Sequence, residues 1–324
     1  MEREKPITSL GQTRFTAATI TIACVISSGI VVHSFRTQQS DQLPEKNLTQ
    51  QNLADIDTAA LLAFQPSRST CDEILRRDAV STEHLTAALL FLARQQRVPT
   101  LRVLVQRTQQ LTDQSSTAEL VNLTRLFADL VAKSDGWRDS VVELTHGDSA
   151  QTRRVAYATQ ILIDDGLESV VHPDAPDDQI AEVLRALPFV ASESLQQAMY
   201  DDVKRVISDK QTAALTRNTA IEISAQLSGR QAEKTRDLVA LLRNEQHMEP
   251  LLRAINQMPS ETWPDDQIGF LAAGLISWVA EQSDISRNSK QTALARTLSE
   301  KLTHRLEPSK RARFQNRMSE LLGD

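Results

Sequence analysis

The fold of this chain is decided by stretches such as residues 81–96, which read STEHLTAALLFLARQQ. The apolar residues Leu85, Ala88, Leu89 and Leu92 follow the spacing i, i+3, i+4, i+7, which places them on one face of an α-helix. The same periodicity recurs from Asp55 onward, and no stretch shows a convincing strand alternation. It predicts further helices over residues 117–133, 150–163, 177–187, 192–207, 211–227, 231–243, 247–257, 265–282, 289–306 and 309–322.

Two sequence pairs predict where helices begin. Thr70 with Glu73, and Ser116 with Glu119, have the spacing of a capping box, in which two side chains satisfy free backbone N–H groups at a helix start. The pentapeptide PDDQI occurs at both 176–180 and 264–268. Its proline suits the first helical position and its acids complement the positive helix end.

The composition favours helices over sheets. Apolar residues make up 40% of the 324 residues, aromatic residues only 4%, and there are nine glycines and eleven prolines, too few for many short strands. The net charge of −6 and the scarcity of aromatic side chains argue against a nucleic-acid partner.

The spacing of the predicted helices indicates a repeat architecture. Helix starts near residues 81, 117 and 149 are about one helix pair apart, as in a solenoid. Later spacings are irregular, and the tetratricopeptide and ankyrin signatures are absent. We therefore expect an all-α chain in which residues 56–324 form an irregular HEAT-like helical-repeat solenoid.

An N-terminal transmembrane helix is predicted to precede the repeat domain. Residues 15–35 contain no Asp, Glu, Lys or Arg, and as a helix they would reach roughly 30 Å, the thickness of a bilayer core. Basic residues before this span indicate that residues 1–14 are cytoplasmic. The polar, glutamine-rich residues 36–55 are predicted to be a flexible linker. These features predict a single-pass protein of the cytoplasmic membrane, with its bulk on the outer, periplasmic side.

A cleaved signal peptide is an alternative interpretation of the same segment. Ser27, Ser28 and Gly29 offer the small residues that a signal peptidase requires. The apolar run resumes at residues 30–32, which a cleaved signal does not need, so we prefer an uncleaved anchor. A lipoprotein site at Cys24 is disfavoured because the apolar stretch continues beyond it.

The search for catalytic and cofactor motifs is negative. The chain has no dinucleotide fingerprint, no complete P-loop, no Ser-x-x-Lys pair and no Cys-x-x-Cys motif. Its six histidines are scattered singly, and His247 between Glu245 and Glu249 is better explained as a solvated helix start than as a metal ligand. We therefore predict no catalytic residue, no metal and no cofactor, and interpret the chain as a non-enzyme.

The charge distribution gives the one candidate site. Residues 164–182 hold seven acids and no Lys or Arg, whereas residues 287–317 hold nine Lys or Arg against two acids. These runs are either solvated helix faces or docking surfaces for an acidic protein, an anionic lipid surface or another copy of the chain. The basic docking patch is predicted to comprise Lys301, Arg305, Lys310, Arg311, Arg313 and Arg317.

Two tryptophans are predicted to mark the core near the C-terminal end. Trp263 precedes the second PDDQI proline, and Trp278 lies in the apolar helix that follows. The core around them is expected to include Phe270, Leu271, Leu275 and Val279.

Parts of the chain resemble a known class of proteins. The stretches EILRRD at 73–78 and LTAALLFLA at 85–93 resemble the HEAT-like region of large exported bacterial redox proteins, which carry propeller, c-type cytochrome or cupredoxin domains. Trp263-Pro264 and residues 306–322 are similar too. The haem and copper motifs are absent, so no functional residue is carried over. The resemblance implies an exported helical scaffold beside electron-transfer modules.

Three functions are compatible with these features. The first is a non-catalytic, membrane-anchored scaffold that binds protein partners such as acidic or redox proteins. The second is an accessory subunit of an exported electron-transfer complex with a cytochrome or dehydrogenase partner. The third is an enzyme whose site is dispersed over the solenoid surface.

Overall fold

The computed structural model describes residues 67–133, 136–168, 170–171, 175–242, 247–281 and 290–323. The chain divides into two units, Met1–Gln65 and Pro66–Asp324, and the described residues belong to the second. They form helices and no strands, which confirms the all-α prediction for this part of the chain. The predicted anchor at 15–35, its flanking segments and the beginning of the repeat domain lie outside the described residues.

The described residues contain fourteen α-helices and two short 3₁₀ helices. The α-helices are α4 (Arg68–Arg76), α5 (Thr82–Gln96), α6 (Thr100–Gln109), α7 (Thr117–Val131), α8 (Gly136–Leu144), α9 (Ala150–Asp164), α10 (Asp177–Ala186), α11 (Glu193–Ser208), α12 (Ala214–Ser224), α13 (Gln231–Leu242), α14 (Met248–Gln257), α15 (Asp265–Glu281), α16 (Lys290–Arg305) and α17 (Pro308–Leu322). The 3₁₀ helices are η1 (Leu187–Phe189) and η2 (Ser260–Thr262).

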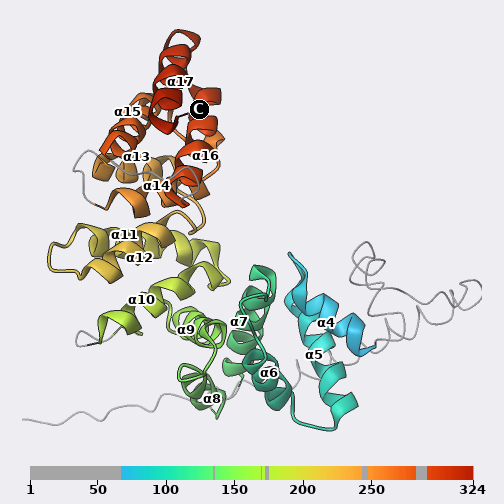
Figure 1. The fold of residues 1–324 in the computed structure, drawn as a ribbon. Helices are drawn as coiled ribbons and strands as arrows, with labels where there is room; N and C mark the ends of the chain where they lie inside the picture. Colours follow the sequence, from blue (N-terminus) through green and yellow to red (C-terminus); the bar gives the residue numbers. More distant parts are fainter. Residues whose placement is uncertain are drawn as a thin grey trace, which may run out of the picture. The chain divides into compact units, whose positions relative to one another are not determined.

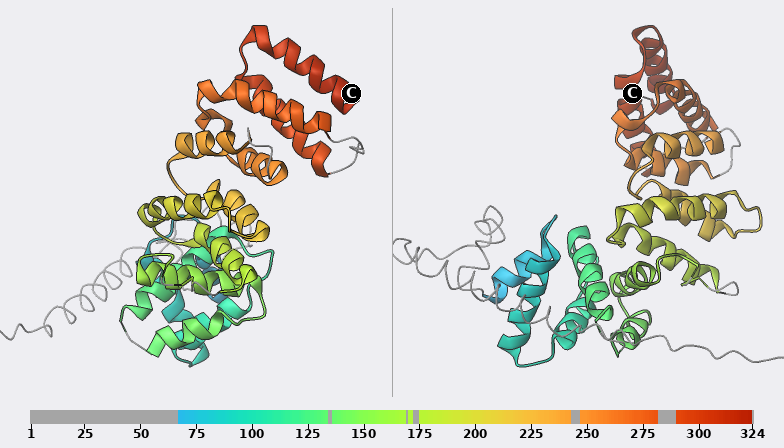
Figure 2. Two further views of the ribbon diagram at one scale, coloured as in Figure 1. Left: turned by 90° about the vertical axis from the view of Figure 1, so that its left-hand side faces the viewer. Right: turned by 180° about the vertical axis from the view of Figure 1, so that it is seen from behind.

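The later helices stack in two rows. In one row α10 packs on α12, α12 on α14 and α14 on α16, and in the other α13 packs on α15 and α15 on α17 (Figure 1). Both views in Figure 2 show α15, α16 and α17, coloured orange to red, side by side. The helices of the first row begin 37, 34 and 42 residues apart, so each step spans about one helix pair. This arrangement is repeat-like.

The earlier helices join the first of these rows. α7 packs on α9, and α9 packs directly on α10, the next helix in the sequence. The starts of α5, α7 and α9 are 35 and 33 residues apart, which agrees with the predicted spacing. Elsewhere in this row every second helix of the sequence packs on the next, but α9 and α10 are consecutive helices and both belong to it. The step from α9 to α10 is therefore shortened to 27 residues, and the step from α14 to α16 is the longest at 42 residues.

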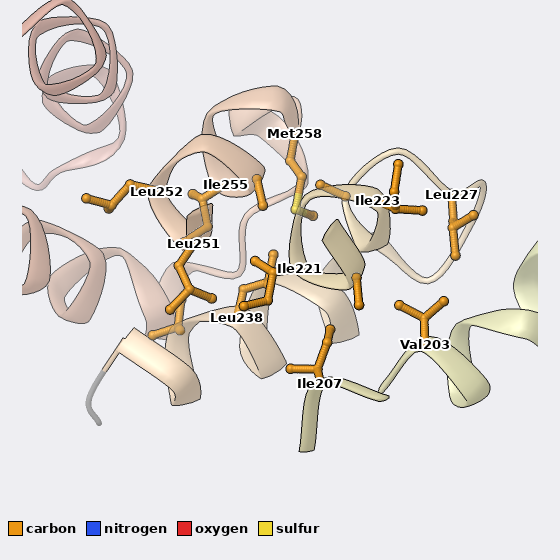
Figure 3. Packing of buried hydrophobic residues seen from close by; sticks show 14 of the residues in the cluster. Val203, Ile207, Ile221, Ile223, Leu227, Leu238, Leu251, Leu252, Ile255 and Met258 are labelled. Atoms are coloured by element: carbon orange, nitrogen blue, oxygen red, sulfur yellow. The ribbon is translucent and has the colours of Figure 1, made fainter. Parts of the chain in front are cut away.

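A continuous aliphatic core fills the space between the rows from α9 to α17. Figure 3 shows part of it, where side chains from α11 to α14 meet others from the turns after α12 and α14: Val203, Ile207, Ile221, Ile223, Leu227, Leu238, Leu251, Leu252, Ile255 and Met258. Trp263 and Trp278 are buried, as predicted. Phe270 is not, because its side chain lies on the outer face of α15 and is 49% exposed. Its assignment to the core was wrong.

The predicted helix starts are confirmed in part. Ser116 caps α7 by accepting a hydrogen bond from the Glu119 N–H (3.1 Å), but the Glu119 carboxylate turns away to Arg107 (3.0 Å) instead of closing the capping box. At α4 the prediction of Thr70 was wrong. Ser67 is the cap, and its hydroxyl accepts from the Thr70 N–H (3.1 Å).

The two PDDQI segments begin α10 and α15 at the predicted residues 177 and 265, but their prolines precede the first helical position instead of occupying it. Pro176 and Pro264 immediately precede these helices, whose first residues are Asp177 and Asp265. α10 belongs to one row and α15 to the other. Duplicated repeats would occupy the same row, so the shared pentapeptide reflects similar helix-capping chemistry.

Core packing gives a test of this architecture. Leu238 is 1% exposed between α13 and its neighbours, so Leu238→Ala should lower the free energy of unfolding by about 2–5 kcal/mol through lost burial and a residual cavity. The matched control is Leu215, which lies on α12 and is 48% exposed. Leu215→Ala should change the free energy of unfolding by less than ~0.5 kcal/mol. Urea unfolding followed by circular dichroism measures both. Equal losses in the two variants would contradict the burial described for Leu238.

Candidate functional site

The predicted basic patch begins on α16, where its cations bind backbone carbonyls of the preceding repeat. The Lys301 ammonium donates to the carbonyl of Asn256 at the end of α14. The Arg305 guanidinium donates to the carbonyls of Ser260 (2.8 Å) and Trp263 (2.9 Å). Both residues therefore fasten the turn between α14 and α15 to α16.

The rest of the patch lies on α17, and three of its cations are exposed. Lys310, Arg313 and Arg317 follow the spacing i, i+3, i+7, so they share one face of the helix. Lys310 pairs with Glu307 (3.1 Å) and Arg317 with Glu320 (2.9 Å), both one turn away. Such exposed pairs are weak and are easily exchanged for other partners.

The positive charge of α16 and α17 is only partly neutralised by ion pairs within the chain. Arg311 donates to the Leu306 carbonyl (3.1 Å), and Arg305 also pairs with Asp265 of α15 (2.7 Å). A guanidinium bonded to a carbonyl keeps its full charge. Residues 290–323 carry eight Lys or Arg and three acids, so the terminal helix pair retains a local positive excess. The structure thus brings the six predicted residues together on two adjacent helices.

The acidic run is also partly paired within the chain. Asp164 forms an ion pair with Arg138, and Glu182 pairs with Arg185 (2.8 Å). Four further acids of this run are exposed and have no ion pair with any residue that the structure describes. They are Asp165, Glu168, Asp177 and Asp178. They lie at the end of α9, in the following turn and in the first turn of α10.

A pattern that the sequence analysis missed links α9 and α12. Both helices begin with Ala-x-Thr-Arg-x-x-Ala, at 150–156 and 214–220. Thr152 and Thr216 are buried and donate to the carbonyls of Thr108 (2.8 Å) and Asp177 (3.3 Å), so each hydroxyl joins its helix to a neighbour. The adjacent arginines hold loop carbonyls: Arg153 binds Gly147 and Asp148, and Arg217 binds Asp209.

A second missed feature is the buried lysine of α13. Lys234 is 0% exposed, and its ammonium donates to the carbonyls of Leu227 (2.5 Å) and Ser228 (3.4 Å) in the turn after α12. The ammonium lies 5.5 Å from the centre of the Tyr200 ring. Burial, followed by the positive charge of Arg230, lowers the pKa of Lys234 to about 8.

An ionic network surrounds this lysine and joins α11 to α13. Arg230 lies over the Tyr200 ring at 5.0 Å and pairs with Asp201 (2.9 Å) and Glu233 (2.8 Å). The Tyr200 hydroxyl donates to Asp237 (2.8 Å), which also pairs with Lys204. Burial, followed by the hydrogen bond to Asp237, raises the pKa of Tyr200. A lysine of lowered pKa could serve as a nucleophile elsewhere, but here its amine is enclosed and engaged in helix packing.

A polar cleft of about 480 Å³ lies between α4, α6 and α7. It is lined by Arg76, Arg107, Gln110, Leu111, Thr112, Gln114, Ser115, Ser116 and Glu119. Arg107 bridges Asp72 (2.9 Å) and Glu119 (3.0 Å), so the strongest charges in the cleft are already paired. We interpret the cleft as a polar contact region that joins α4, α6 and α7.

The predicted absence of a metal site remains a prediction. Among the described residues, no group of three or more His, Cys, Asp or Glu is placed to hold a metal ion. His247 lies against Arg217 (3.4 Å), and burial together with that guanidinium lowers the pKa of the imidazole. His247 immediately precedes α14, which agrees with its interpretation as a helix start, but it is half-buried and not fully solvated. None of the helices in the described ranges is long and apolar enough to cross a membrane.

The lysine site predicts a pH dependence of stability. Because the pKa of Lys234 falls to about 8 in the folded chain, the unfolded chain binds more protons between pH 8 and its ordinary pKa near 10.4. The free energy of unfolding of the wild type should therefore rise relative to Lys234→Met as the pH increases from 8 to 9.5. Urea unfolding at several pH values measures this difference. A constant difference would show that Lys234 titrates normally.

Comparison of the chain with protein-family models, with curated proteins and with solved structures found no match.

Proposed function

We propose that this chain is a non-catalytic scaffold, built as an irregular HEAT-like solenoid and tethered to the cytoplasmic membrane by residues 15–35. The repeat domain lies on the periplasmic side and binds protein partners through its surface. The observation that carries this proposal is the two-row stacking of α10 to α17, because stacked helix pairs present extended surfaces suited to protein binding.

The use of polar residues in the described helices supports a structural role. Tyr200, Arg230 and Lys234, whose pKa values depart strongly from their ordinary ones, are engaged with one another and with α11 and α13. Perturbed groups of this kind mark active sites when they line a cleft, but Lys234 is enclosed and its partners hold helices together. The basic patch is the surface feature best suited to a partner, which would be acidic.

The membrane tether can be tested with charges placed in its centre. Lysine at the middle of a membrane-spanning helix costs about 2.5–3.5 kcal/mol, so Ile22→Lys with Ile26→Lys should release the protein from carbonate-washed membranes. The matched control is Gln38→Lys with Gln42→Lys, which adds the same charges at the same spacing in the predicted linker. Immunoblotting of the membrane and soluble fractions measures the outcome.

Membrane retention of the first variant would contradict the anchor. N-terminal sequencing of the wild-type protein distinguishes the uncleaved anchor from the remaining alternative, a cleaved signal peptide. A mature chain that begins near Ile30 and is recovered in the soluble periplasmic fraction would establish a cleaved signal peptide instead.

A further inference from the structure

We infer that the basic face of α17 binds the acidic α9–α10 turn of a second copy of this chain. The basic face is formed by Lys310, Arg313 and Arg317, and the acidic turn by Asp165, Glu168, Asp177 and Asp178. The inference rests on the proposed scaffold function and names its partner as another molecule of the same protein.

The cations of the basic face are available to a partner. All three side chains are exposed, and their i to i+7 spacing extends over about 10 Å of one helix face. Lys310 and Arg317 have acids one turn away within α17, and these surface pairs cost little to exchange. No described residue pairs with the charge of Arg313.

α17 packs on α16, and α16 is fastened to the preceding helices by cations that are not exposed. Arg305 and Lys301 bind backbone carbonyls of the α14–α15 turn, and Arg311 binds the Leu306 carbonyl at the start of α17. The carbonyl bonds leave the charges of Lys301 and Arg311 in place, whereas Arg305 also forms an ion pair with Asp265 (2.7 Å). A positive surface on a fixed frame loses less conformational entropy on binding than one on a free segment.

Charge complementarity identifies the second copy as the occupant. The acidic turn is the matching surface on the same chain, and its four exposed acids have no cation opposite them among the described residues. An anionic membrane is a weaker fit, because the exposed residues between the cations of α17 are Ala312, Gln315 and Asn316, which offer no large apolar side chain to insert. Contact between two different patches is heterologous, so it generates rings or open chains of molecules.

The test is sedimentation velocity of the full-length chain in a non-ionic detergent, at low and at high salt. The wild type should self-associate at 0.05 M salt and dissociate toward monomers at 0.5 M, because screening shortens the reach of the charges. Reversal of the basic face with Lys310→Glu, Arg313→Glu and Arg317→Glu should weaken association at least about tenfold. Reversal of the acidic turn with Asp165→Lys, Glu168→Lys and Asp178→Lys changes the summed charge of its four acids from −4 to +2 and should do the same.

The decisive variant combines both reversals in one chain. Opposite charges then face each other again with their signs exchanged, so the combined variant should recover association. The matched control reverses three exposed cations elsewhere, with Lys133→Glu, Arg205→Glu and Arg236→Glu, and should associate as the wild type does. Thermal unfolding of every variant shows whether the fold is retained.

Several outcomes would overturn the inference. They are a wild type that stays monomeric at 0.05 M salt, association that survives the basic-face reversal, and a combined variant that fails to recover. Binding of the wild type to vesicles of anionic phospholipid without self-association would also overturn it. None of these results affects the membrane-release experiment, so failure of this inference is distinguishable from failure of the proposed function.

Discussion

The structure depends on the need to satisfy backbone carbonyls where helices end. Each helix leaves its last carbonyls without an internal partner, and stacking in rows brings these ends against neighbouring helices where water is scarce. In this chain, long polar side chains of a later helix donate to carbonyls at helix ends and in the turns that follow them. Arg125 of α7 donates to the Val80 carbonyl (2.6 Å), and Asn122 donates to that of Arg77 (2.8 Å). The α16 cations and Lys234 repeat this solution farther along the chain.

This use of cations explains how one set of residues can stabilise the fold and leave a charged surface. A carboxylate partner would neutralise the ammonium, whereas a carbonyl satisfies its hydrogen bonds and leaves its charge. A buried cation also loses its hydration, which disfavours the charged form. For this reason burial lowers the pKa of Lys234. Arg305 on α16 keeps part of its side chain in contact with solvent, with 23% of it exposed.

Much of the helix order could be predicted from sequence, because long amphipathic helices such as α5 and α7 carry several apolar residues at helical spacing. α6 was missed because its apolar residues, Leu101, Val103, Leu104 and Val105, form one short run interrupted only by Arg102, and such a run does not distinguish a helix from a strand. α8 was missed because it is only nine residues long. Phe270 was misassigned because an aromatic residue in an apolar helix suggests burial, whereas the neighbouring helices cover the opposite face of α15.

The candidate site was predictable in position but not in its contacts. Counting charges located the basic run, since net charge is a property of sequence alone. The carbonyl bonds of Lys301 and Arg305 join residues 45 positions apart, so no local pattern announces them. The same 45-residue separation links Arg125 to Val80, in a different pair of repeats. A basic residue that follows a helix end by about 45 residues is therefore better interpreted first as a hydrogen-bond donor to the backbone carbonyls near that end. When the cations that bind carbonyls are set aside, the exposed ones are Lys310, Arg313 and Arg317. They form a smaller candidate interface than the six residues predicted from the sequence.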